Sequence, residues 1–198
     1  FFLVLTLLSK ESKLKIKNVN VNKSRTGIIK ILNMMNANIL LKNKKIYKGE
    51  AVSDIYIKSK NNLKGIKCPK SLNSSAIDEF LLIFLVAAKS KGISSFKNLT
   101  ELNKKESPRL DIAVNFLKKI GIKVTRNNDD IKIYGNSKLE LSGKFIINNF
   151  KKDHRVFMMS CIAALTLGGK WKIYDKDSIN SSFPKFLKLI KKLGAKIN

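Results

Sequence analysis

The side chains best suited to hold an anion in this sequence are its few arginines. Of 40 basic residues only four are arginine, and three of these, Arg25, Arg109 and Arg155, stand at or beside expected helix starts. A guanidinium is a planar fork that binds a carboxylate or phosphate through two hydrogen bonds, which a lysine ammonium cannot imitate. Arg109 and Arg155 therefore indicate a binding role. Arg25 fits a binding or a surface position equally, and Arg126 is expected on the surface.

Carboxylates occupy similar positions. Asp78 and Glu79 directly precede the most apolar run, 80–88, and Glu106 follows Lys105 in the turn before another expected helix. A carboxylate at a helix start is often only a cap, but a partly buried one can have a raised pKa and act as a general base. Both interpretations stay open.

His154, the only histidine, lies between Asp153 and Arg155 at the start of an apolar helix. An ordinary capping Asp with an incidental His fits this tripeptide as well. Taken together, the three groups point to a dianionic substrate held by arginine and lysine, with Asp and Glu moving protons. The sequence carries no glycine-rich phosphate loop, dinucleotide-binding fingerprint, metal-ligand cluster or Ser/Cys nucleophile motif.

The elements that must position these residues form a threefold internal repeat. Each copy runs through an apolar helix, a strand, a polar loop, an amphipathic helix and another strand. The apolar helices are expected at 1–8, 77–88 and 156–167. The alternating runs that predict the first strands lie at 13–19, 93–99 and 170–176. The loops, where a Ser hydroxyl or a Pro is typical of a helix start, lie at 23–27, 105–109 and 181–184.

The amphipathic helices show apolar residues at three- and four-residue spacing. These apolar positions are Ile28, Ile31, Leu32 and Met35 in one copy and Phe186, Leu189, Ile190 and Leu193 in another. Asn36, Gly121 and Gly194 are expected to end the helices, with strands at 37–41, 122–126 and 195–198 and further strand-like runs at 55–57 and 131–134. The sequence therefore predicts an α/β domain with buried helices and outer amphipathic ones. Converging helix starts would form an anion site.

The net charge of +26 invites a nucleic-acid interpretation. The lysines, however, are scattered along the whole length, without a basic tail or a known nucleic-acid-binding motif, and this pattern is typical of solvated faces. Cys68 and Cys161 lie far apart, which argues against a disulfide framework or zinc site and fits a reducing, cytoplasmic compartment. The apolar stretch 1–8 is too short to span a membrane, and a start at Phe inside an apolar run suggests a piece of a longer polypeptide.

Six motifs resemble, in order, those of the EPSP synthase (3-phosphoshikimate 1-carboxyvinyltransferase) family. They are SRTGIIKIL, GEAVSDI, SSAIDEF, ELNKKESPRL, KDHRVFMM and SINSSFPKFLKLIKKLGAKI. The resemblance covers nearly the whole chain and corresponds to the C-terminal half of the enzyme. It implies an inside-out α/β barrel in which three βαβαββ repeats form one of two similar domains. Residues 1–198 would then be a C-terminal enolpyruvyl transferase domain.

The resemblance also implies an activity. The family transfers the enolpyruvyl group of phosphoenolpyruvate to the 5-hydroxyl of shikimate 3-phosphate and releases phosphate, on the route to chorismate and the aromatic amino acids. It needs no metal or organic cofactor, and its partners are these two substrates. The full-length protein is expected to be a cytoplasmic monomer, with no membrane association or specific nucleic acid. The 198-residue chain alone is expected to lack turnover, because the family's site forms between two domains.

Carried onto this sequence, the resemblance gives each candidate a role. Asp78 would accept a proton near the attacking hydroxyl, and Glu106 would donate or shuttle a proton at the methylene carbon. Lys105 would contact the shikimate phosphate or the transition-state charge. Arg109 and Arg155 would hold phosphoenolpyruvate, with His154 beside them.

Two departures from the family pattern bear on these roles. Pro108 stands where the family usually has Asp, which predicts the loss of a carboxylate near Arg109, and Lys152 precedes the Asp-His-Arg motif. Two alternatives also remain: the related UDP-N-acetylglucosamine enolpyruvyl transferase, and a basic nucleic-acid-binding module.

Overall fold

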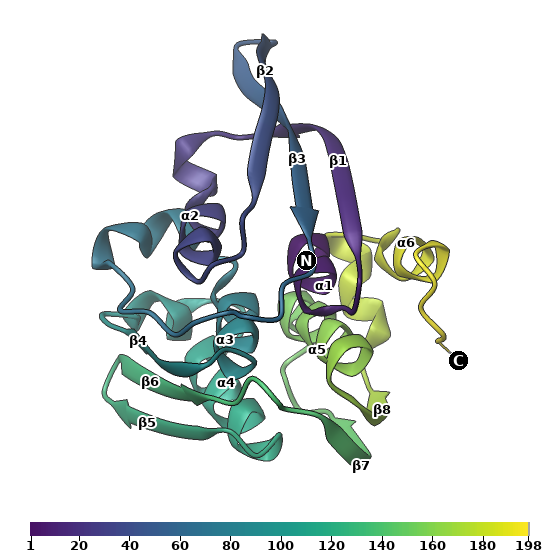
Figure 1. Ribbon diagram of the computed structural model, residues 1–198. Coiled ribbons are helices and arrows are strands. Elements are labelled where there is room, and N and C mark those ends of the chain that lie inside the picture. The colour runs from purple at the N-terminus through teal and green to yellow at the C-terminus, as the bar shows by residue number, and fades with distance from the viewer. Residues whose placement is uncertain (198) are drawn as a thin grey trace.

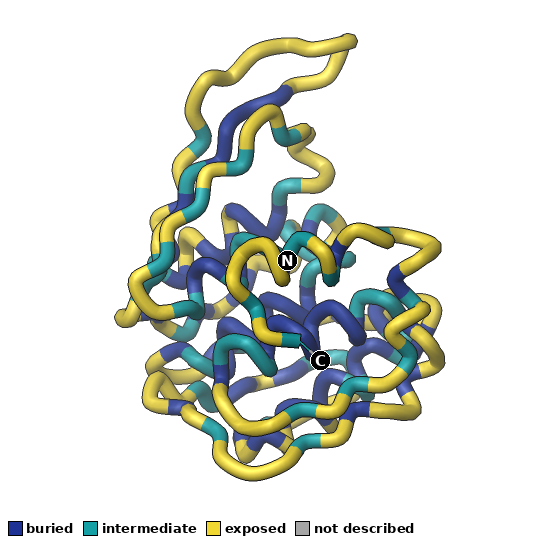
Figure 2. Tube along the Cα trace, turned by 90° about the vertical axis from the view of Figure 1, so that its right-hand side faces the viewer, coloured by how far each residue is buried: buried dark blue, intermediate teal, exposed yellow. Residues whose placement is uncertain are grey.

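Three apolar helices lie at the centre of the computed structural model, which describes residues 1–197 (Figure 1). They are α1 (Phe2–Leu8), α3 (Phe80–Ala88) and α5 (His154–Leu167), and each contacts the other two. Every residue of α3 is buried. A helix without a polar face has to be enclosed on all sides, so α3 and most of α5 take the interior, where the buried parts of the trace lie (Figure 2). In α1 only Val4, Thr6 and Leu7 are buried, and the other four residues are half-buried.

Three sheets surround the central helices (Figure 1). The first contains β1 (Lys13–Asn20), β2 (Leu40–Tyr47) and β3 (Glu50–Lys58); the second contains β4 (Gly92–Phe96), β5 (Lys123–Asn127) and β6 (Asp130–Gly135). The third pairs β7 (Leu141–Ile147) in parallel with β8 (Gly168–Ile173). The first two sheets have equivalent orders, β1-β3-β2 and β4-β6-β5, with antiparallel pairing throughout. The predicted α/β class and internal repeat are therefore confirmed, with helices inside and sheets outside.

The amphipathic helices follow the predicted pattern with one exception. They are α2 (Gly27–Met34), α4 (Arg109–Lys119) and α6 (Phe186–Lys192). The apolar positions of α2 are buried, as are Phe186 and Ile190 in α6, but Leu193 is 55% exposed because it lies just beyond the last turn. Asn36, Gly121 and Gly194 follow the ends of the helices as predicted, and all three adopt a left-handed backbone, with φ of 75°, 78° and 97°.

Several predicted boundaries are wrong, mostly where a residue takes a left-handed backbone. The apolar helix starts at Phe80 rather than 77, because residues 74–76 form a 3-10 turn and Glu79 is the N-cap. The strand predicted at 93–99 ends at Phe96, before left-handed Asn98. Likewise, β2 starts only after left-handed Asn38, and β8 ends before left-handed Asp175.

Other expectations also differ from the structure. Residues 195–197 form no strand, Asn198 lies outside the described residues, and β7 was not predicted. The expected Ser caps are wrong, since Thr26, Pro108 and Lys185 precede α2, α4 and α6 without a side-chain capping bond. The expected prolines are confirmed, because Pro108 and Pro184 stand at the starts of α4 and α6. Among the helices described, none is long and apolar enough to cross a bilayer.

The turn before α5 carries backbone strain. Lys151 and Lys152 have φ of 52° and 55°, a region that costs a residue with a Cβ about 1–2 kcal/mol. Glycine adopts this region without that cost but loses more entropy on folding.

We therefore predict that Lys152→Gly stabilises the fold modestly. In urea unfolding of the full-length protein, the free energy of unfolding should rise by about 0.5–1 kcal/mol. Lys132→Gly, in the middle of β6, is the control and should be destabilising, since its backbone is extended. A loss of stability in Lys152→Gly as large as that of the control would contradict this account.

Candidate active site

Asp153 is fully buried at the start of α5 and joins two helix starts. Its Oδ1 accepts hydrogen bonds from the backbone N–H groups of Arg155 and Val156 at 2.9 and 3.4 Å, so it caps its own helix. Its Oδ2 accepts from the Ser107 hydroxyl and from Arg109 Nε, both at 2.8 Å. The carboxylate therefore fixes the start of α4 against the start of α5.

Arg109 is the cation of this buried pair and is only 3% exposed. Besides the Nε bond, its Nη2 donates to Asp153 Oδ1 at 3.4 Å. Its Nη1 is also buried but has no hydrogen-bond partner among the described residues. This atom lies 3.5 Å from Asp78 Oδ1. A buried N–H that is held in place without a hydrogen bond is well suited to receive an acceptor from a ligand.

Pro108 brings no carboxylate to Arg109, as predicted, but Arg109 is not left without carboxylate partners. Asp153 supplies a carboxylate from the next repeat, and Pro108 itself has a φ of −71°, the value that its ring imposes. Ser107, expected near a helix start as a cap, donates to Asp153 instead.

Asp78 lies where three arginines meet. Its Oδ2 is 3.1 Å from Arg25 Nη1 and 3.4 Å from Arg155 Nη2, and its Oδ1 faces Arg109. Arg155 also donates from Nη1 to the Asp78 backbone carbonyl at 2.9 Å. All three repeats therefore contribute to one connected cluster. Arg25 belongs to this cluster, but its side chain is 74% exposed, so its position fits both a binding role and a surface role.

Arg126 lies outside the cluster, as expected. It is on β5, where it pairs with Asp111 of α4 and donates to the Asn128 carbonyl. Its position is that of a structural surface residue.

Glu79 is the acidic residue at this site whose proton affinity is raised. Burial raises the pKa of the Glu79 carboxyl above its usual value, and Arg155, whose Nη1 lies 3.7 Å away, opposes this effect in part. The sequence left open whether a carboxylate before this helix is only a cap or has a raised pKa, and Glu79 is both the N-cap residue of α3 and a group with a raised pKa. This side chain is therefore a second candidate for holding a proton.

Glu106 and His154 face each other at the exposed side of the cluster. His154 Nδ1 lies 3.1 Å from Glu106 Oε2, and Arg109 Nη2 lies 3.8 Å from Glu106 Oε1. The Glu106 side chain is 52% exposed, so it can reach a ligand from solvent. Lys105 is exposed too, and within residues 1–197 its side chain forms no ion pair or hydrogen bond. The other five candidates form one connected set of contacts, whereas Lys105 stands apart.

The residues that the sequence analysis missed are Asp153 and Ser107. Asp153 was interpreted only as a cap, because nothing in a single sequence shows that a cap also faces an arginine 44 residues away. Glu106, Asp153 and His154 lie close enough to hold a metal ion. The donor set does not fit one, since both Asp153 oxygens are already filled by Ser107, Arg109 and two backbone N–H groups.

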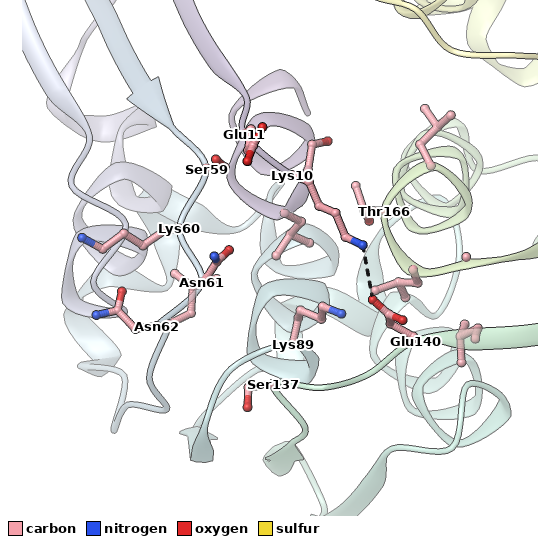
Figure 3. A pocket seen from close by; sticks show the side chains of 17 residues that line it. Lys10, Glu11, Ser59, Lys60, Asn61, Asn62, Lys89, Ser137, Glu140 and Thr166 are labelled. Atoms are coloured by element: carbon pink, nitrogen blue, oxygen red, sulfur yellow. Dashed lines mark ion pairs between the residues drawn. The ribbon is translucent and has the colours of Figure 1, made fainter.

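A cavity of about 890 Å³ lies at the other ends of the central helices (Figure 3). Lys10, Lys89 and Glu140 point toward one another there, with Lys10 Nζ 3.7 Å from Glu140. Lysines at helix C-terminal ends offset the negative end of the helix dipole, so their presence has a structural explanation.

We predict that Asp153→Asn destabilises the fold by about 3 kcal/mol, because it leaves the Arg109 charge buried without its partner. Urea unfolding of the full-length protein measures this. Asp111→Asn, which breaks the exposed pair with Arg126, is the matched control and should cost less than about 1 kcal/mol. Equal losses in the two variants would contradict a special role for Asp153.

The same pair should make stability depend on pH. Burial alone would raise the pKa of Asp153, but the bonds from Arg109 and Ser107 outweigh burial and hold this pKa below its usual value. A lowered native pKa stabilises the fold above the unfolded pKa of about 3.9, and this contribution disappears as the pH falls through the native pKa. Asp153→Asn should therefore lose less stability than the unaltered protein between about pH 5 and pH 3. Parallel losses would contradict the assignment.

Comparison with known proteins identifies the family. The family model for EPSP synthase (3-phosphoshikimate 1-carboxyvinyltransferase) matches residues 1–190. Proteins named 3-phosphoshikimate 1-carboxyvinyltransferase from Petrotoga mobilis and Ruthia magnifica are 35% and 37% identical, over 98% and 100% of this chain. The chain covers 44% and 45% of those proteins, so it spans about half the length of the curated relatives it matches.

Solved structures agree with this result. EPSP synthase from Acinetobacter baumannii superposes with a TM-score of 0.87 at 32% identity, covering 96% of this chain and 44% of that one. The enolpyruvyl transferase NikO from Streptomyces tendae has a TM-score of 0.69 at 13% identity, a likeness of fold alone. With the family model covering almost the whole sequence, this chain belongs to the EPSP synthase (3-phosphoshikimate 1-carboxyvinyltransferase) family.

Proposed function

We propose that the full-length protein transfers the enolpyruvyl group of phosphoenolpyruvate to the 5-hydroxyl of shikimate 3-phosphate and releases phosphate. We propose further that residues 1–198 form the C-terminal of two similar domains and that the other domain completes the site. The relatives that carry this activity in their names support the proposal. So does one observation above all: Arg109, a guanidinium held by Asp153, keeps a buried Nη1 free of hydrogen bonds beside Asp78 and Arg155.

Arg109 and Arg155 suit the binding of phosphoenolpyruvate. Both are anchored, Arg109 by Asp153 and Arg155 by the Asp78 carbonyl, so little side-chain entropy remains to be lost when an anion binds. Their forks provide paired donors for the carboxylate and phosphate of this substrate. Lys105, exposed and unpaired among the described residues, is free to contact the phosphate of shikimate 3-phosphate.

The acid–base steps are assigned to two carboxylates. The oxygen of the 5-hydroxyl bonds to C2 of phosphoenolpyruvate while Asp78 takes the hydroxyl proton and Glu106 delivers a proton to C3. The tetrahedral adduct then loses a proton from C3 to Glu106, and the bond from C2 to the phosphate oxygen breaks as Asp78 returns its proton to the leaving phosphate. The arginines near Asp78 lie 3.1 to 3.5 Å from its carboxylate oxygens and hold this side chain in place for the first step.

His154 acts in this scheme through Glu106. With Nδ1 3.1 Å from Oε2, it orients the half-exposed carboxylate toward the methylene carbon. It is therefore a positioning residue in this proposal, and its contact with Glu106, which also faces Arg109, supports a place beside the proposed phosphoenolpyruvate site.

The proposal predicts that Asp78→Asn and Glu106→Gln each lower kcat of the full-length protein by about a hundredfold or more. Phosphate release from the two substrates measures this. Glu101→Gln is the control for Glu106→Gln, because within residues 1–197 Glu101 pairs only with Lys104, on the same 3-10 turn. The kcat of this control variant should stay within about twofold of the unaltered protein.

Two results would refute the proposal. Near-normal kcat in both Asp78→Asn and Glu106→Gln would remove the acid–base assignments. Turnover by the isolated 198-residue chain at the rate of the full-length protein would show that a second domain is not needed.

A further inference from the structure

The outer face of the first sheet carries a pocket that is separate from the candidate active site. It has a volume of about 760 Å³. Lys15, Tyr56 and Leu40 form one row across β1, β3 and β2, since Tyr56 is the register partner of both others. The neighbouring row, Leu14 and Ile57, faces the core. Because side chains alternate along a strand, the Tyr56 row points away from the core.

Lysines are concentrated in this pocket. Five of its twelve lining residues are lysine, compared with 36 of 198 in the whole chain, and none of the twelve is acidic. The five are Lys13, Lys15, Lys42, Lys58 and Lys60. By contrast, the cavity of about 890 Å³ has three lysines and two glutamates among seventeen lining residues. Lys60 lines both, but Figure 3 shows it extending away from Lys10 and Lys89. The general lysine content of the chain therefore does not explain the pocket.

Tyr56 and Asp54 hold two of the ammonium groups close to each other. Lys15 Nζ and Lys42 Nζ lie 4.9 and 5.5 Å from the centre of the Tyr56 ring. Lys15 Nζ is also 3.2 Å from Asp54 Oδ2. An aromatic face and a carboxylate attract cations that would otherwise repel each other. Within the described residues, none of the other four lysines has a carboxylate partner, so most of the positive charge is uncompensated.

These features select a ligand with several negative charges. The volume is that of a small-molecule site. A single carboxylate would meet only one or two of five ammonium groups, whereas a chain of phosphates places charges along the length of the pocket, and lysine serves phosphate well as a point charge. We propose that this pocket binds a polyphosphate group, either as an inorganic chain or as part of a nucleoside triphosphate.

A second Lys–Tyr pair provides the matched control. Lys123 Nζ lies 4.9 Å from the ring centre of Tyr134, its register partner in the second sheet, and neither residue lines the two cavities described above. If such pairs only stabilise sheets, the two pairs should respond alike to substitution.

The test is calorimetric titration of the full-length protein at about 0.15 M salt, which screens weak contacts between exposed charges. The purified enolpyruvyl product of the proposed transfer is present in excess, without phosphate, to fill the proposed catalytic site without turnover. Sodium tripolyphosphate and ATP should both bind, and the double variant K15A/K42A should weaken both by about tenfold or more. Lys123→Ala should change neither affinity beyond about twofold, and K15A/K42A should retain its enolpyruvyl transfer rate within about twofold.

The same titrations also distinguish the two possible ligands and show which results would overturn the proposal. Equal affinities for tripolyphosphate and ATP would assign the inorganic chain, and at least about tenfold tighter binding of ATP would assign the nucleotide. No binding of either, or the same loss in Lys123→Ala as in K15A/K42A, would overturn the proposal. A single-stranded DNA oligonucleotide that binds tighter than both and loses affinity in K15A/K42A would overturn it in favour of a nucleic-acid surface.

Discussion

The buried ion pair between Arg109 and Asp153 is the interaction on which the rest of the site depends. Neither partner is more than 3% exposed, and removing either would leave a charge in the interior, a cost of about 3–5 kcal/mol. Because Asp153 also caps α5 and accepts from Ser107, the pair fixes two helix starts from different repeats. It also aims Arg109 Nη1 at Asp78, where the first and third repeats contribute Arg25 and Arg155.

This convergence follows from the architecture. Three apolar helices can be enclosed only by packing against one another, and equivalent copies then bring their starts to the same end of the domain. Polar residues at or near the starts of α2, α3, α4 and α5 meet there, far from the lysines at the opposite ends of the central helices. Among the described residues the third sheet has two strands, β7 and β8, instead of three. Even so, α5 takes the place in its repeat that α3 takes in the repeat before it.

Much of this could be predicted from the sequence, because it follows from local pattern. The apolar run at 80–88 predicts a buried helix, and the alternation at 13–19 predicts a strand. In a chain that otherwise uses lysine, the few arginines indicate positions where a guanidinium is needed to bind an anion. The double role of Asp153 could not be predicted, since it depends on a contact across 44 residues. Nor could the raised pKa of Glu79, because it depends on how deeply the folded chain buries this carboxyl. Left-handed Asn38, Asn98 and Asp175 moved strand boundaries by a few residues without altering topology.

The most direct test is a double-mutant cycle on kcat/KM for phosphoenolpyruvate, using Asp153→Asn, Arg109→Lys and the combined variant of the full-length protein. If Asp153 acts by orienting the Arg109 guanidinium, replacing Asp153 should have no further effect once Arg109 has been replaced by Lys. The combined variant should then be no worse than Arg109→Lys within about threefold, a strongly non-additive result. Losses that multiply would mean that the two residues act independently, and the buried pair would no longer account for the site.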